Sequence, residues 1–307
     1  MQKETIKINS KQDNLPIEIT LYIPEKDIKG IVQISHGMAE HKERYEDFLT
    51  FLCQNGFLAA ISDHRGHGKS ILKKEDLGYF YDETSDFIVE DLHDITLLLK
   101  ERYPDKSFIL FGHSMGSLVV RKYIQKYDKD IDKLIVCGSP SKNNLVDIAI
   151  FLTKIIKLFK GDNYRSKLIQ NLAFGSYRKK SDFSDNAWLS FNKDNVLDYD
   201  KDEYCGFIFT TNGFLNLFRL MKSVYQKRNY IVHNKDLPIY FIAGENDPVI
   251  INEKAWFKSQ EFLKSCGYQN ITSTLYPHMK HEILNETDSN KVFEDVLNFC
   301  NSKKKEA

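Results

Sequence analysis

The residues best suited to chemistry are those at positions 112–116, which read GHSMG. The apolar run at residues 108–111 precedes them, and a helical pattern at residues 118–127 follows. A G-x-S-x-G pattern between a strand and a helix forms a sharp turn that exposes the serine hydroxyl, and the glycines avoid side-chain clashes. This arrangement predicts Ser114 as a nucleophile and the backbone N–H of Met115 as an oxyanion donor.

A serine hydroxyl is a weak nucleophile until a base removes its proton, so the chain must also supply a histidine and an acid that orients it. Asp247 follows the apolar run at residues 239–243 and is our candidate acid; its alternative role is an Asx-type turn before the next proline. His278 and His281 both follow the apolar run at residues 271–276 and compete for the role of base. The order serine, aspartate, histidine is the one that this type of turn requires.

A second oxyanion donor is expected from the loop at residues 35–41, which reads SHGMAEH and follows an apolar run at residues 31–34. The backbone N–H of Met38 is our candidate, because Gly37 lets the chain approach the substrate closely. His36 is expected to brace this loop rather than to react.

Four histidines, two in this loop and two in the segment at residues 63–68, suggest an alternative chemistry, because imidazole nitrogens bind metal ions. They are His36, His41, His64 and His67. No complete ligand set has a familiar metal-binding spacing, so we interpret them as bracing residues in turns. We therefore expect neither a metal ion nor another cofactor in the reaction.

Eight short segments have strand-like patterns. The first two alternate apolar and polar residues, as an antiparallel hairpin does, and the others are mostly apolar runs typical of strands buried on both faces. The eight segments are residues 4–8, 17–23, 31–34, 57–61, 108–111, 134–136, 239–243 and 271–276. Helical patterns separate most of them, most clearly at residues 88–99. This alternation predicts an α/β fold with a mostly parallel eight-stranded sheet and helices on both faces.

The alternation breaks at residues 140–235, where amphipathic helical patterns occur, as at residues 145–160 and 214–224, without a convincing strand. A helical insertion between the sixth and seventh strands is typical of a lid over the strand ends. We therefore predict one α/β core at residues 1–139 and 236–307, with a helical cap at residues 140–235 inserted in it.

Composition bounds the partners and the location of this 307-residue chain. Lys plus Arg and Asp plus Glu number 43 each, so no global charge attracts nucleic acid, and we expect no nucleic-acid partner. The five cysteines are scattered without a paired or metal-binding spacing, which favours free thiols in a reducing, cytoplasmic location. Residues 1–12 lack the apolar run of a secretory signal, and no stretch is apolar enough to span a membrane. The oligomeric state is left open.

Together these motifs resemble the monoglyceride lipase and bacterial lysophospholipase-like branch of the α/β-hydrolases, which is also grouped with the serine aminopeptidases of S33 type. The resemblance covers nearly the whole chain. Besides GHSMG, it rests on residues 36–41 (HGMAEH) with Arg44 and Tyr45, residues 63–70 (DHRGHGKS), residues 244–249, residues 281–286 (HEILNE) and the cap segments 188–189 and 205–207. The family carries its base in the HEILNE-like segment, so the resemblance selects His281 over His278, which stands where glycine is common.

The resemblance implies an α/β-hydrolase fold with a helical cap, and a serine carboxylic-ester hydrolase that forms an acyl-enzyme on Ser114. The implied substrate is a lipid-like monoacyl ester, either a monoacylglycerol or a lysophospholipid. Glu40 and Arg44 match positions that help to hold the glycerol end in monoglyceride lipases. Leu284 departs from the animal enzymes, which have a histidine three residues beyond the base, so the resemblance leaves the alcohol open.

The expected cap helix at residues 145–160 has an apolar face bordered by lysines. Six apolar residues gather there: Ile148, Phe151, Leu152, Ile155, Ile156 and Phe159. We expect this face to pack on the core or to cover the active site, as the apolar face of a lid does. The alternative is transient contact of the cap with a membrane surface, which would make a cytoplasmic protein peripheral to the membrane.

Three other functions stay open. A short-chain esterase would share the same three catalytic residues. A proline-iminopeptidase-like aminopeptidase would need an acidic cluster in the cap to hold a substrate ammonium, and the candidates are Asp182, Asp185, Asp194, Asp198, Asp200 and Asp202. A non-catalytic ligand-binding member of the fold is the third, and a complete set of catalytic residues argues against it.

Overall fold

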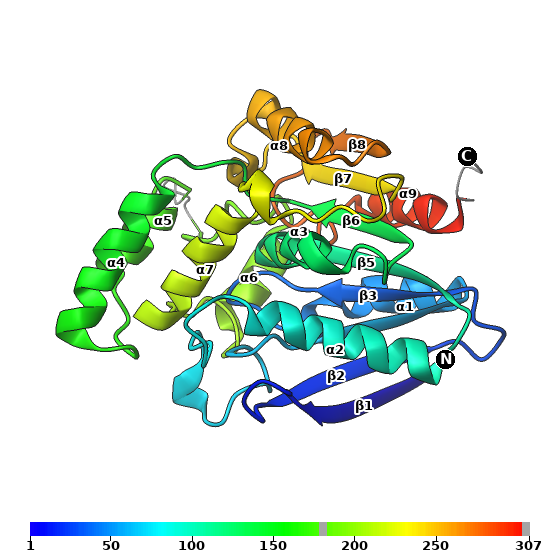
Figure 1. Cartoon of the computed structure of the whole chain (residues 1–307), viewed down its shortest axis with the longest axis horizontal. Coiled ribbons are helices and arrows are strands. Elements are labelled where there is room, and N and C mark those ends of the chain that lie inside the picture. Colours follow the sequence, from blue (N-terminus) through cyan, green and yellow to red (C-terminus); the bar gives the residue numbers. More distant parts are fainter. Residues whose placement is uncertain (178–182, 303–307) are drawn as a thin grey trace.

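The computed structural model describes residues 1–177 and 183–302 and contains one eight-stranded sheet (Figure 1). The strands lie in the order β1-β2-β4-β3-β5-β6-β7-β8. β2 pairs antiparallel with β1 and β4, and the other pairs are parallel. Their bounds are β1 Gln2–Asn9, β2 Pro16–Ile23, β3 Gly30–Ser35, β4 Phe57–Ser62, β5 Ser107–His113, β6 Lys133–Cys137, β7 Ile239–Gly244 and β8 Ile271–Tyr276. The predicted α/β fold with a mostly parallel eight-stranded sheet is confirmed.

Burial along the strands follows their place in the sheet. Every residue of β3, β4, β6 and β7 is buried, because helices cover both faces of a parallel sheet. β1 lies at one edge and alternates between exposed and half-buried residues. The apolar runs therefore mark the centre of the sheet, and the alternating segment marks its edge.

Two apolar clusters hold the helices against the two faces of the sheet. One contains Leu92, Leu118 and Trp256 from α2, α3 and α8, and the other contains Phe48 and Phe293 from α1 and α9. In Figure 1, α2 and α3 lie in front of the sheet, while α1 and α9 lie behind it. These helices are α1 Glu46–Gln54, α2 Phe87–Arg102, α3 Met115–Tyr127, α8 Glu253–Cys266 and α9 Ser289–Asn301.

Among the described residues between β6 and β7 there are four α-helices and one short 3-10 helix but no strand. The four α-helices are α4 Val146–Lys160, α5 Lys167–Phe174, α6 Lys193–Lys201 and α7 Thr211–Ser223. α4, α5 and α7 lie together beyond one end of the central strands, at the left of Figure 1. We call residues 140–235 the insertion.

The apolar face expected on α4 is largely exposed, so the expectation that it packs on the rest of the protein is wrong for most of its members. Leu152 and Ile156 are half-buried against the core, as predicted. The exposed members are Ile148, Phe151, Ile155 and Phe159, and the neighbouring Leu158 is 80% exposed. An amphipathic pattern places these residues on one side of a helix but does not determine what covers that side. Within the described ranges, no helix is both long and apolar enough to cross a membrane.

Candidate active site

The GHSMG segment forms the sharp turn that its sequence predicts. β5 ends at His113, α3 begins at Met115, and Ser114 between them has φ 52° and ψ −117°. A side chain at Gly112 would come within 2.4 Å of the Gly116 carbonyl oxygen, so this position has no room for one. Such a left-handed backbone costs a non-glycine residue about 1–3 kcal/mol and persists because the surrounding structure imposes it.

The structure brings the three predicted catalytic residues together. The Ser114 hydroxyl lies 2.8 Å from His281 Nε2, and His281 Nδ1 lies 3.0 Å from Asp247 Oδ2. The second oxygen of Asp247 accepts a hydrogen bond from the Val249 backbone N–H at 2.8 Å. The histidine and the aspartate are buried, and each of the three residues follows a parallel strand, namely β5, β7 or β8. Their side chains therefore converge at one edge of the sheet.

His278, the competing histidine, lies elsewhere. Its side chain is exposed, and its φ of 55° places it in the left-handed region that favours glycine. Of the two histidines, His281 alone is hydrogen-bonded to the serine and the aspartate.

The loop proposed as the second oxyanion donor lies against the serine. Gly37 and Met38 line one cavity together with Ser114 and Met115. A side chain at Gly37 would meet Glu40 Oε1 at 2.4 Å and the Ser114 Cβ at 3.2 Å, so only glycine fits. The backbone N–H groups of Met38 and Met115 stay our predicted oxyanion donors.

His36 braces this loop, as predicted. Its Nδ1 donates to the Gly37 carbonyl oxygen at 2.8 Å, and its Nε2 accepts a hydrogen bond from the His64 backbone N–H at 2.9 Å. Burial lowers the pKa of His36 well below its ordinary value, that of His64 to about 3 and that of His67 to about 4. These three rings are neutral and hold the turns together.

His41, the fourth of these histidines, contacts the insertion instead. Its Nε2 lies 2.8 Å from the Asp202 carboxylate. Among the described residues, the donor atoms of His41, Asp202 and Cys205 form the one group that lies within 4.8 Å, close enough to suit a metal ion. The set shares one member with the four histidines considered from the sequence. Within this set, the hydrogen bond between His41 and Asp202 joins the loop before α1 to the insertion.

A cavity with about 1090 Å³ of empty space, its open mouth included, reaches Ser114 and His281. Part of its apolar lining comes from α5 and α7 and includes Ala173, Phe174, Leu217, Phe218 and Met221. Its polar lining includes Glu40, Asn186, Tyr199 and Glu282, all outside α5 and α7. The cavity beside Ser114 and His281 therefore has both apolar and polar lining residues.

The segments that resembled a cap in sequence also line this cavity. Trp188, Leu189, Gly206 and Phe207 are among its lining residues. The Trp188 ring lies 5.2 Å from the His281 ring, measured between centroids, and the Gly206 N–H donates to the Ala39 carbonyl oxygen at 2.9 Å. The insertion therefore forms part of the wall around the reactive residues.

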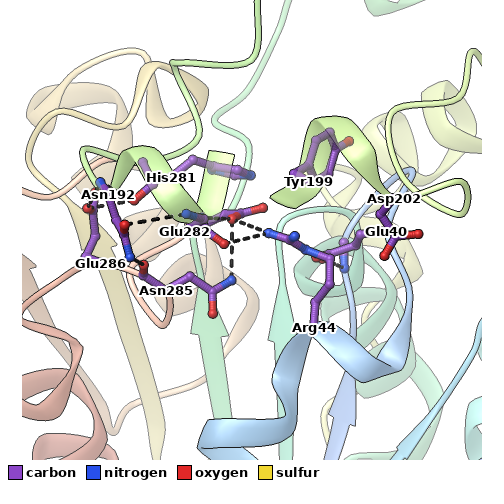
Figure 2. Close-up of polar contacts among 12 residues, drawn as sticks. Glu40, Arg44, Asn192, Tyr199, Asp202, His281, Glu282, Asn285 and Glu286 are labelled. Atoms are coloured by element: carbon purple, nitrogen blue, oxygen red, sulfur yellow. Dashed lines mark hydrogen bonds and ion pairs between the residues drawn. The ribbon is translucent and has the colours of Figure 1, made fainter. Parts of the chain in front are cut away.

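Glu40 and Arg44 lie next to this wall and are engaged by other side chains (Figure 2). Glu40 lines the cavity, and its Oε1 accepts from the Gly37 N–H at 2.5 Å and from the Tyr45 hydroxyl at 2.8 Å. Arg44 is not among the lining residues; its Nη2 donates to Glu282 Oε2 at 2.6 Å. A substrate-binding role for Glu40 and Arg44 stays a prediction. Arg44 is linked to the cavity by its hydrogen bond to Glu282, which is a lining residue.

His113, the residue before the serine, is a buried histidine whose pKa is raised. Burial disfavours its imidazolium, but hydrogen bonding to Glu40 and the charges of Glu40 and Glu282 outweigh burial and raise the pKa. Tyr45 donates to Glu40, so its oxygen accepts from His113 Nδ1 at 3.0 Å, while Nε2 donates to the His281 carbonyl oxygen at 3.2 Å. Both ring nitrogens thus face oxygen atoms that can accept, an arrangement that favours the protonated form and agrees with the raised pKa.

The aspartates considered for an aminopeptidase do not gather at this cavity. Asp182 lies outside the described residues. None of the other five, at positions 185, 194, 198, 200 and 202, is a lining residue, and all but Asp202 are exposed. The insertion thus offers no acidic cluster for a substrate ammonium among these five.

Sequence reasoning missed three side chains that approach this site. Asn195 and Tyr199 lie four residues apart on α6, and Glu282 directly follows the predicted base. Glu282 stood inside the HEILNE segment but received no role. The spacing of Asn195 and Tyr199 places them on one side of a helix, yet nothing local indicated what that side faces.

Comparison with known proteins gives one family. The family model described as "Serine aminopeptidase, S33" matches residues 26–288. Monoglyceride lipase from Mus musculus is 31% identical, covering 89% of this chain and 82% of its own; monoacylglycerol lipase from Mycolicibacterium smegmatis is 25% identical, covering 91% and 90%. A crystal structure of a highly thermostable carboxyl esterase from Bacillus coagulans in complex with glycerol has a TM-score of 0.88, with 25% identity and 98% of each chain covered.

Proposed function

The chain belongs to the serine aminopeptidase S33 family and is an ester hydrolase, and from this premise we propose that Ser114, His281 and Asp247 are its catalytic triad. We propose lipid-like monoacyl esters as its substrates. The observation that carries the proposal is the continuous hydrogen-bonded series of Ser114, His281 and Asp247 at the wall of a partly apolar cavity.

Acylation begins when the Ser114 Oγ attacks the ester carbonyl carbon while its proton passes to His281 Nε2. Asp247 holds the Nδ1–H tautomer and stabilises the imidazolium, and its own second oxygen is held by Val249. The carbonyl oxygen becomes negative and accepts hydrogen bonds from the backbone N–H groups of Met115 and Met38. The alcohol then leaves with the proton from His281, and the acyl group stays on Ser114.

Deacylation reverses these roles with water. His281 takes a proton from water as the water oxygen attacks the acyl-enzyme, and then returns the proton to Ser114 Oγ. The products are a free carboxylic acid and an alcohol, and no cofactor enters the balance. Trp188, which belongs to the insertion, packs near His281 and covers part of this side of the imidazole.

The lining of the cavity supports a monoacyl ester. The α5 and α7 residues offer an apolar surface for an acyl chain, whose burial contributes roughly 0.8 kcal/mol for each methylene. Glu40, Tyr199 and Glu282 offer hydrogen-bond partners to an alcohol that carries hydroxyl groups. We therefore favour medium or long acyl chains on a polar alcohol over short-chain esters.

We propose further that residues 140–235 act as a cap whose α4 and α5 contact lipid. The exposed apolar residues on this side are Leu145, Ile148, Phe151, Ile155, Leu158, Phe159, Leu168 and Leu172. The exposed Lys154 and Lys160 lie among them and suit anionic headgroups. The five free cysteines support a reducing, cytoplasmic setting, from which such a cap would reach a membrane surface transiently.

Hydrolysis of p-nitrophenyl esters of increasing acyl length, followed by 1-monoacylglycerols and amino-acid anilides, tests this proposal. The variants are Ser114→Ala, His281→Ala and, as a matched control, His278→Ala. We expect a maximum at eight or more carbons, loss of roughly 10⁴-fold or more in the first two variants, and little change in the third.

Other outcomes would redirect the proposal in distinct ways. A maximum on acetyl esters would keep the triad and remove the lipid assignment. Faster cleavage of anilides than of esters would favour an aminopeptidase, and turnover that survives Ser114→Ala would contradict the triad itself.

A further inference from the structure

Glu282, the residue after the proposed base, presents a carboxylate to the cavity with only one oxygen in use. Its side chain is 3% exposed, and the residue lines the cavity beside His281. Its Oε2 accepts from Arg44 Nη2 at 2.6 Å, from Asn195 Nδ2 at 2.7 Å and from Asn285 Nδ2 at 3.4 Å. Among the described residues, every hydrogen bond to this carboxylate ends on Oε2. Oε1 therefore remains available as an acceptor.

Arg44, which does not line the cavity, fixes this carboxylate through Oε2 (Figure 2). Its Nη2 also donates to Asn195 Oδ1 at 3.0 Å, and its Nε lies 3.4 Å from Glu40 Oε2. Its guanidinium lies 4.9 Å from the centre of the Tyr199 ring. Burial disfavours the charge of Arg44, but Glu282 and Glu40 outweigh burial and raise its pKa, so it stays a cation. The free oxygen of Glu282 is thus held in one place.

The charges around Glu282 suit a neutral hydroxylated ligand. A hydroxyl that donates to an ionised carboxylate forms one of the stronger hydrogen bonds in proteins. A phosphate group in the same place would put a second negative charge next to Glu282 and Glu40, and the low local dielectric makes such repulsion costly. Arg44, the nearest cation among the described residues of this network, is already engaged by both carboxylates.

We infer that Glu282 determines the alcohol specificity of the enzyme. Its Oε1 accepts a hydrogen bond from a hydroxyl of the leaving alcohol, so esters of neutral polyols are preferred over esters of phosphorylated alcohols. Arg44 and Asn195 act as positioning residues, because they hold Oε2 and do not touch the alcohol. The inference rests on the proposed function and narrows it to one class of alcohol.

Matched octanoate esters of different alcohols test this inference through kcat/KM. The set is 1-octanoylglycerol, propyl octanoate, which lacks both free hydroxyls, and 1-octanoylglycerol 3-phosphate, all below their critical micelle concentrations. For the wild type we expect the glycerol ester to exceed each of the other two by about 10-fold, the value of one good hydrogen bond. Equal values for glycerol and propyl esters would overturn the inference without any variant.

Glu282→Gln is the isosteric variant, with Glu294→Gln, an exposed carboxylate on α9, as the matched control. We expect Glu282→Gln to lower kcat/KM about 10-fold for the glycerol ester and less than about threefold for the propyl ester. The difference in kcat/KM between the glycerol ester and the phosphate ester should also become smaller. An equal fall on all three esters would mean that Glu282 is only structural.

Failure of the proposed function would look different. If the wild type hydrolyses none of the three esters, or if hydrolysis survives Ser114→Ala, the ester-hydrolase mechanism on Ser114 fails. If Ser114-dependent hydrolysis occurs without discrimination among alcohols, the mechanism stands and the role of Glu282 fails.

Discussion

Two parts of the insertion meet the rest of the molecule in opposite ways. Residues 186–206, which we call the anchored segment, join the loops around the catalytic residues through buried polar contacts, such as Asn195 to Glu282 and Tyr199 to the Ala39 carbonyl oxygen. α4 and α5 instead expose large apolar side chains, including Leu158 and Phe159. One chain segment thus contains both a fixed wall of the active site and a surface suited to lipid. The difference shows that one insertion can combine a segment held by polar contacts with helices that expose apolar side chains.

Glu286 holds the anchored segment in place. Of the changes considered, we expect its removal to have the largest effect on stability and activity. Its carboxylate accepts from the Ser190 hydroxyl and from the backbone N–H groups of Phe191, Asn192 and Lys280. Glu286→Ala removes the carboxylate that accepts from all four donors at once, so we expect the free energy of unfolding to fall by at least about 3 kcal/mol. Because His281 follows Lys280, we expect kcat/KM to fall by roughly 100-fold as well.

Urea unfolding and ester hydrolysis of the same preparations measure this prediction. Glu294→Ala on the exposed side of α9 is the control, and we expect it to change the free energy of unfolding by less than about 0.5 kcal/mol. Wild-type stability in Glu286→Ala would mean that the anchored segment is not held by these contacts.

On α4 we expect the reverse, namely that replacing exposed residues affects lipid contact and leaves the catalytic site unchanged. Replacing Leu158 and Phe159 together by serine removes exposed apolar surface, so we expect hydrolysis of soluble esters to stay within about twofold of the wild type. Hydrolysis of 1-monoacylglycerol in anionic vesicles should fall about 10-fold, because less apolar surface can enter the lipid interface. Leu97→Ser, at an exposed position on α2, is the control. Equal losses on soluble and vesicle substrates would show that α4 serves the catalytic site directly.

The smallest effect concerns the titration of His113, which contacts Glu40 and the His281 carbonyl oxygen. Its pKa is raised in the folded protein, so its contribution to stability is complete below the unfolded value near 6.5 and is lost as the pH rises through the folded value. Between pH 6 and 8.5 we expect the wild type to lose on the order of 1 kcal/mol for each unit by which the pKa is raised. His113→Gln should lack this loss in urea unfolding, and parallel curves would contradict the assignment.

The sequence predicted the sheet and the meeting of three catalytic residues, because each signal is local. Ser114 lies in a turn of fixed chemistry, and Asp247 and His281 follow apolar runs whose carboxyl ends must share an edge in a parallel sheet. Choosing His281 over His278 needed the family resemblance, and the structure then placed His281 beside Ser114.

The parts that sequence reasoning missed depend on contacts between distant segments. Arg44 and Glu282 are 238 positions apart, and no periodicity or spacing reports that their side chains meet. The exposure of α4 was missed for a related reason, because an apolar helix face looks the same whether protein, lipid or water lies against it. Local patterns therefore identified the residues of the proposed triad, and tertiary packing determined what surrounds them.

The most direct test of the central claim is labelling by an alkyl fluorophosphonate, which reacts with a serine whose hydroxyl is activated by a base. The labelled residue is identified by peptide mass spectrometry in the wild type, Ser114→Ala and His281→Ala. We expect a single adduct on Ser114 in the wild type, none in Ser114→Ala and a labelling rate at least about 100-fold lower in His281→Ala. An adduct on another residue, or undiminished labelling without His281, would contradict the proposed triad.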